Sequence, residues 1–106
     1  MSGTLERLKA LVSKGEVRIS AHGYDEIAAD HLSVRNVVSG LTDAELLEDY
    51  PEFPKGPCVL VLQRDQDNQT IHAVWGIPKG TTTPAVLVTA YRPDPVQWTD
   101  DFSSRK

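Results

Sequence analysis

The stretch TIHAVWGI, residues 70–77, predicts a β-strand in the middle of an antiparallel meander. Side chains along a strand alternate between the two faces of a sheet, so one face of this strand would be wholly apolar. The apolar set is Ile71, Ala73, Trp75 and Ile77, and the opposite set is Thr70, His72, Val74 and Gly76. His72 is therefore expected either to be a half-buried histidine with a hydrogen-bonded neighbour or to belong to a site on the sheet surface.

Two further apolar runs flank this stretch and predict neighbouring strands over Cys58–Arg64 and Val86–Tyr91. Short polar connections between such runs are typical of antiparallel hairpins. The segment Ala44–Tyr50 is open to two interpretations. Thr42 followed by Glu45 resembles a helix capping box, whereas the alternation along the segment also fits an edge strand.

The first part of the chain has helical patterns. A first helix is expected between Thr4 and Gly15, a second begins after Ser20 and ends near residues 30–32, and a third begins after Ser33. Residues 16–19 are expected to be a short extended link. Helices followed by a meander predict an α+β fold, with the N-terminal helices packed on one face of a three- to four-stranded antiparallel sheet.

The other face of such a sheet is then left for solvent, a ligand or a partner, and His72 would point to that open side. Trp98 and Phe102 are expected to hold the C-terminal segment against the domain.

Composition narrows the function classes. A chain of 106 residues, 40% hydrophobic and 25% charged, is expected to form a single domain over residues 1–106. No apolar run approaches the ~20 residues of a membrane span. A single cysteine excludes an intramolecular disulfide, which fits a reducing, cytoplasmic location. The net charge of −4 argues against strong sequence-independent nucleic-acid binding, and the scattered glycines form no phosphate loop, so no cofactor is expected.

Three histidines are candidates for proton transfer, because histidine titrates near neutral pH. Gathered on the open face, a base, an acid and an anion-holding cation would suffice to cleave RNA by internal attack of a 2′-hydroxyl without a metal. The simpler alternative is a hydrogen-bonded strand histidine beside a packing tyrosine and a solvated arginine. The candidates are His22, His72 and Tyr91 as catalytic residues, and Tyr50, Glu48 and Arg92 as substrate-binding residues.

Two other patterns point more to structure than to chemistry. His22, Asp25 and Glu26 share one helix face, an arrangement that can hold a divalent metal but more often marks a solvated surface. No matching ligand pair occurs elsewhere, so no metal site is predicted. Cys58 lies in an apolar run and is expected to be an inert thiol.

Several short motifs carry a resemblance to a known family. In order and spacing they resemble the domain of unknown function 4258 family over about Leu8 to Lys106. The motifs are Ile19–His22, Leu47–Pro51, Pro57–Leu62, Ile71–Val74 and Val88–Pro93, with Trp98 and Asp101–Phe102 after them.

The resemblance implies an α+β fold similar to RelE-like toxins, with Ala44–Tyr50 as a strand. It also implies a toxin-like ribonuclease of a toxin–antitoxin type system. The family's polar positions correspond to His22, Glu48, Tyr50, His72, Thr89 and Tyr91. Glu26 and Asp30 stand where the family usually has arginines, and this difference, like the net charge, weighs against RNA as the substrate.

Two partner hypotheses follow. An enzyme would meet RNA, through cations that include Arg18, Arg35, Arg92, Arg105 and Lys106. A non-catalytic interaction module would use the open sheet face, or the edge strand Ala44–Tyr50, to bind a protein such as an antitoxin or a second copy of the chain.

Overall fold

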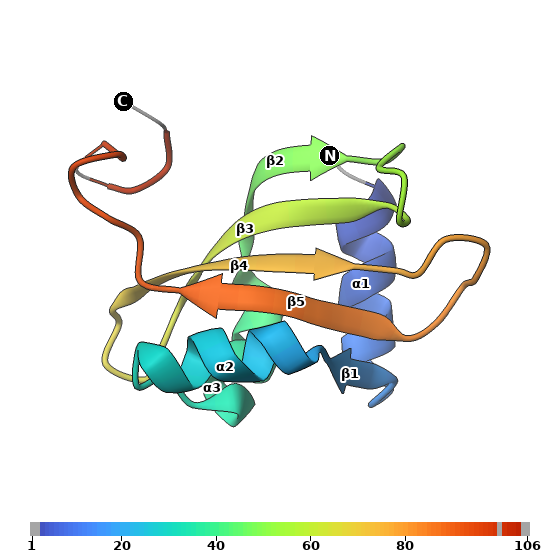
Figure 1. The fold of residues 1–106 in the computed structure, drawn as a ribbon, viewed down its shortest axis with the longest axis horizontal. Helices are drawn as coiled ribbons and strands as arrows, with labels where there is room; N and C mark the ends of the chain where they lie inside the picture. Colours follow the sequence, from blue (N-terminus) through green and yellow to red (C-terminus); the bar gives the residue numbers. More distant parts are fainter. Residues whose placement is uncertain (1–2, 100, 105–106) are drawn as a thin grey trace.

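The computed structural model describes residues 3–99 and 101–104 and has an α+β fold, with three α-helices and a five-stranded sheet in these residues (Figure 1). No helix in the described part is both long enough and apolar enough to cross a membrane. In chain order the elements are α1 (Gly3–Ser13), β1 (Val17–Ile19), α2 (Ala21–Ala29), α3 (Val34–Gly40), the 3₁₀ turn η1 (Leu41–Asp43), β2 (Glu45–Tyr50), β3 (Cys58–Arg64), β4 (Thr70–Gly76) and β5 (Ala85–Tyr91).

Strand β4 lies in the centre of the sheet, whose strand order is β1-β5-β4-β3-β2. It pairs with β3 along its whole length and with β5 on its other side, antiparallel in both cases. The predicted meander around residues 70–77 is therefore confirmed. Trp75 is fully buried on one face, and His72 points to the other.

The sheet is wider than predicted, and one of its strand pairs is parallel. Residues 16–19 were expected to be an extended link, but Val17–Ile19 forms β1 and pairs with Ala85–Leu87 in parallel. Backbone bonds continue this pairing at both ends, since Ala85 N–H donates to Glu16 and Ser20 N–H donates to Leu87. Three residues are too few for their alternation to identify a strand, and the partner β5 is the last strand in the chain.

The ambiguous segment before Pro51 is the edge strand β2, preceded by η1, so the helical alternative is wrong. A bulge interrupts its pairing with β3, because Leu46 opposes Val61 while Glu48 opposes Leu60. The extra residue shifts the alternation by one position. Leu46 therefore packs against the core, whereas Glu48 and Tyr50 both lie on the open face.

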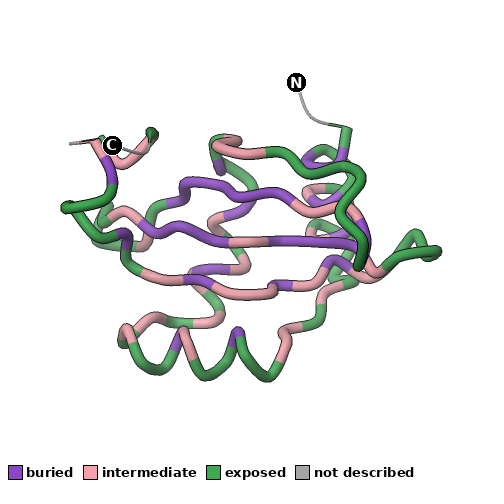
Figure 2. The backbone as a smooth tube through the Cα atoms, turned by 45° about the horizontal axis from the view of Figure 1, so that its top comes forward, coloured by how far each residue is buried: buried purple, intermediate pink, exposed green. Residues whose placement is uncertain are grey.

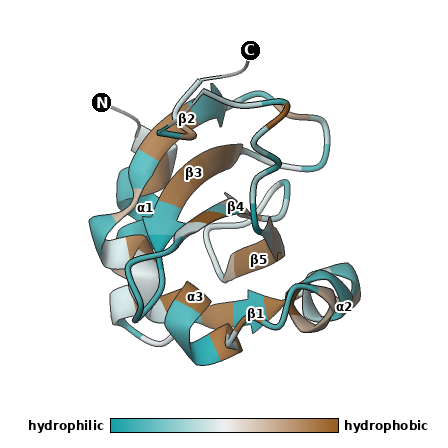
Figure 3. Cartoon of the chain, turned by 90° about the vertical axis from the view of Figure 1, so that its left-hand side faces the viewer, coloured by the Kyte–Doolittle hydropathy of each residue, from teal (hydrophilic) through white to brown (hydrophobic). Residues whose placement is uncertain are grey.

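The helices α1 and α3 cover one face of the sheet, as predicted (Figure 3). Buried residues are concentrated in the central strands and on the inner sides of the helices (Figure 2). Leucines at helical spacing bring α1 into contact with the apolar face of β4. The buried side chains that α1 contributes are Leu5, Leu8 and Leu11, and those of β4 are Ile71, Ala73 and Trp75.

A buried glutamine joins α3 to the sheet. The Gln63 Nε2 donates to the backbone carbonyl of Val37 at 2.7 Å, and its Oε1 accepts a hydrogen bond from Trp75 Nε1 at 3.0 Å. Buried polar groups are tolerated when they are hydrogen-bonded in this way. This link, which sequence patterns did not predict, holds α3 against β3.

Helix α2 lies beside β5 at the edge of the sheet rather than over a face (Figures 1 and 3). Ser20 caps it as predicted, and the Ser20 hydroxyl also donates to the carbonyl of Val88 at 2.8 Å. A Cβ added at Gly23 would lie 2.9 Å from the carbonyl oxygen of Leu87. Glycine therefore permits the close approach that covers the edge of β5.

Candidate functional site

The open face of the sheet carries a groove of about 540 Å³, on the side away from α1 and α3. A row of register partners runs across all five strands at one end of it. Gly76 stands in the middle of this cross-strand row, so the sheet has no side chain there. The row is Arg18, Val86, Gly76, Cys58 and Tyr50.

The lining of the groove is mainly apolar. Its open-face apolar side chains are Leu60, Val74, Val86 and Val88, and the core residues Val59 and Ile77 also contribute to its lining. Burial raises the pKa of the Cys58 thiol above its ordinary value, and the negative charge of Asp49 raises it further. A raised pKa favours the neutral thiol, and the Cys58 side chain is half-buried at the groove.

Polar side chains stand around this apolar lining. On β2, the Tyr50 hydroxyl donates to Glu48 Oε1 at 2.8 Å, and the tyrosine is 45% exposed. Tyr91, at the end of β5, also borders the groove. Three of the six predicted site residues therefore line one groove. Arg18, Phe53 and Lys55 also line it, and of these only Arg18 was predicted from the sequence, as a cation that could meet RNA.

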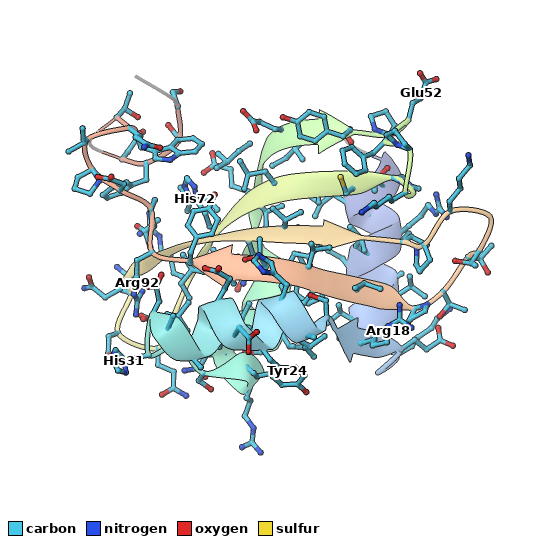
Figure 4. All side chains as sticks on the ribbon, in the orientation of Figure 1. Arg18, Tyr24, His31, Glu52, His72 and Arg92 are labelled. Atoms are coloured by element: carbon cyan, nitrogen blue, oxygen red, sulfur yellow. The ribbon has the colours of Figure 1, made fainter. Side chains whose placement is uncertain are left out.

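His72 is directly opposite Tyr91 in the sheet, and their ring centroids are 5.9 Å apart. The C-terminal segment covers it. The Trp98 ring stands edge-on to His72 at a centroid distance of 4.3 Å, and the Phe102 carbonyl lies 2.7 Å from its Nε2. Because a carbonyl can only accept, Nε2 carries a proton in this arrangement. His72 has no exposed surface, so the predicted open side is closed at this end (Figure 4).

Arg92 is engaged in structural contacts. Its Nη2 lies 2.6 Å from Asp65 Oδ2, its Nη1 donates to the Thr70 carbonyl, and its backbone N–H donates to Asp30. Desolvation acts to raise the pKa of Asp65. The hydrogen bond from Arg92 and two from backbone N–H groups outweigh that effect and lower the pKa. Asp30 stands at a position where the family resemblance implies an arginine. By accepting the backbone hydrogen bond of Arg92, it holds the chain just after β5.

His22 lies on α2 and does not line the groove. Its side chain is 65% exposed, and its Nε2 is 3.8 Å from Glu26 Oε1. In the described part of the chain, no three side chains of the metal-binding types come together. The structure therefore brings Glu48, Tyr50 and Tyr91 to the groove, with His72 behind Tyr91, and leaves His22 and Arg92 outside it.

A family model described as a domain of unknown function, DUF4258, matches residues 19–92, from the end of β1 to the residue after β5. The chain belongs to the DUF4258 family. Searches of curated proteins and of solved structures found no match. The family prediction is thereby confirmed over residues 19–92, a shorter stretch than the predicted Leu8 to Lys106, while the likeness to RelE-like toxins stays a prediction.

Within this DUF4258 domain, the match includes β2 to β5 and with them nearly all of the groove lining. It ends before the segment that covers His72. Trp98 and Phe102 therefore form a closure over the sheet that lies outside the matched residues. The segment itself was expected to pack on the domain, but its position over His72 was not predicted.

Proposed function

We propose that this DUF4258 domain is a binding module whose groove takes up an apolar segment of a partner protein. The supporting observation is the groove itself, about 540 Å³ in volume, with an apolar lining on a sheet face that no helix covers in the described residues. Concave apolar surface exposed to water is typical of binding sites. An antitoxin would be one partner of this kind.

Charge and burial support binding over catalysis. Cleavage of RNA needs a base, an acid and a cation that can all reach a phosphate. His72 is enclosed by the C-terminal segment, and Arg92 is bound by Asp65. Either residue would have to leave its contacts before it could take part in chemistry.

The test is a selection of peptides from a random library on the wild-type protein. Val74→Lys places a charge in the centre of the groove, and Val86→Lys does so at the cross-strand row. Losing the burial of one apolar side chain costs about 1.5–3 kcal/mol, so binding should weaken about tenfold or more. Val96→Lys is the matched control, because Val96 is 76% exposed and lies outside the groove.

Circular dichroism of each variant shows whether it folds, and two groove positions are used so that one folded variant is available. The proposal requires that the groove variants lose binding and the control keeps it. Failure to select any peptide, or equal binding by Val74→Lys, Val86→Lys and the wild type, would refute it.

A second candidate is the metal-independent ribonuclease that the resemblance implies. One observation favours it, because the Tyr50–Glu48 pair and the Tyr91–His72 pair lie on the same sheet face. A base there would take the 2′-hydroxyl proton, the 2′-oxygen would attack phosphorus, and an acid would protonate the departing 5′-oxygen. His72→Ala and Tyr50→Phe should then abolish RNA cleavage and growth inhibition.

Tyr24→Phe is the matched control for the tyrosine variant, since Tyr24 is also exposed but lies on α2. If the purified wild-type protein cleaves no RNA and its expression never slows growth, the enzymatic candidate is lost.

A further inference from the structure

We infer that the partner segment is acidic at one end, and that its carboxylates meet Arg18 and Lys55 at the border of the groove. This inference rests on the proposed binding function and adds the charge of the partner. Arg18 and Lys55 are the only cations among the residues that line the groove in the described part of the chain. Figure 4 shows Arg18 at the β1 edge of the sheet.

Both cations come from backbone that is held firmly in place. Arg18 occupies the centre of β1, directly opposite Val86. The carbonyl of Lys55 accepts a hydrogen bond from Lys79 N–H at 3.0 Å, which ties its loop to the end of β4. The neighbouring Gly56 has a φ of +122°, and a Cβ there would clash with the carbonyl oxygen of Ile77. The backbone of Lys55 is thus packed against the end of the groove.

Neither cation is neutralised by a carboxylate that the structure describes. Arg92, by contrast, pairs with Asp65 at 2.6 Å. The positive charges of Arg18 and Lys55 also contrast with the net charge of the whole protein, which is −4. Two exposed cations beside an apolar surface complement an acidic, apolar segment, since opposite charges stabilise a complex and exclude wrongly charged partners.

The same charges argue against two other occupants. A basic segment would place its cations against Arg18 and Lys55. If a second copy paired its β2 with this β2, two acidic strands would lie side by side, each carrying Glu45, Glu48 and Asp49. Like charges across a strand pair are unfavourable. An acidic segment lying over the face avoids both conflicts.

The probes are the apolar peptide selected on the wild-type protein and its derivatives with two added Asp, Ser or Lys residues at one end. Fluorescence anisotropy should rank the Asp peptide tightest and the Lys peptide weakest, with a difference of about tenfold that shrinks as salt is added. The double variant Arg18→Glu/Lys55→Glu should reverse this order.

Arg7→Glu/Arg35→Glu is the matched control. It changes the net charge equally, but its positions are exposed on α1 and α3, away from the groove. It should keep the wild-type order of the three peptides.

The outcomes separate this inference from the function on which it rests. If Val74→Lys weakens all three peptides but their order does not depend on charge, the acidic partner is refuted and the binding groove stands. An order that the control reverses as well would also refute the inference, because net charge alone would explain it. If Val74→Lys and Val86→Lys leave every affinity unchanged, the proposed function itself fails.

Discussion

The buried link between α3 and the sheet allows a quantitative prediction. In Gln63→Leu, a side chain of similar size removes the acceptor of Trp75 Nε1–H and the donor to the Val37 carbonyl. Both partners are fully buried, so neither can turn to bulk water instead. An unsatisfied buried group costs about 1–3 kcal/mol, and the added apolar burial offsets part of the loss of two bonds. We expect the free energy of unfolding to fall by about 2–4 kcal/mol.

Urea denaturation followed by circular dichroism measures this change, and the slope of the transition should stay the same. Gln97→Leu is the matched control, because Gln97 is exposed and should change the free energy of unfolding by less than about 0.5 kcal/mol. If Gln63→Leu were as stable as that control, the two hydrogen bonds would not hold α3 on the sheet, and the reasoning from burial would be wrong.

Three further variants test other contacts. Gly23→Ala should destabilise the fold although alanine favours helices, because its Cβ would lie 2.9 Å from a β5 carbonyl; thermal unfolding measures this, and a rise in melting temperature would contradict it. The lowered pKa of Asp65 means that its bond to Arg92 stabilises the fold above its ordinary pKa of 3.8 and is lost as pH falls through the lower folded value. In Asp65→Asn, the free energy of unfolding, measured by urea denaturation at a series of pH values, should therefore fall less steeply as the pH drops below about 3.8. An unchanged pH profile would exclude this role for Asp65. Trp98→Ala should make His72 accessible to modification by diethyl pyrocarbonate, which mass spectrometry detects, and the exposed His22 and His31 serve as internal controls. If His72 stays protected in this variant, the C-terminal segment does not cover it.

The sequence predicted those parts of the fold that have a clear local signal. Alternation along residues 70–77 identified the central strand and its two faces. Helix caps at Ser20 and Ser33 were also confirmed. The parallel strand β1 was missed because an alternation over three residues is too short to identify a strand and the pairing is not local. The bulge in β2 was missed because it appears only when two strands are placed in register.

The candidate site was predicted in part. Residue type and strand position brought Glu48, Tyr50 and Tyr91 to one face, where the structure has the groove. The engagement of Arg92 with Asp65 depends on a turn that meets β5 only after the sheet has formed. Lys55 gave no signal because loop residues have no periodicity, and its place beside the groove is set by Gly56.

Mapping the binding surface by NMR tests most directly whether the open sheet face binds an apolar segment. A selected apolar peptide is titrated into the isotope-labelled protein, and the backbone amide shifts are followed. If the groove binds the peptide, the shifts should be concentrated at groove residues such as Leu60, Val74 and Val86, with little change in α1 and α3. Shifts concentrated in those helices, with the groove amides unmoved, would contradict the claim that the open sheet face is the binding site.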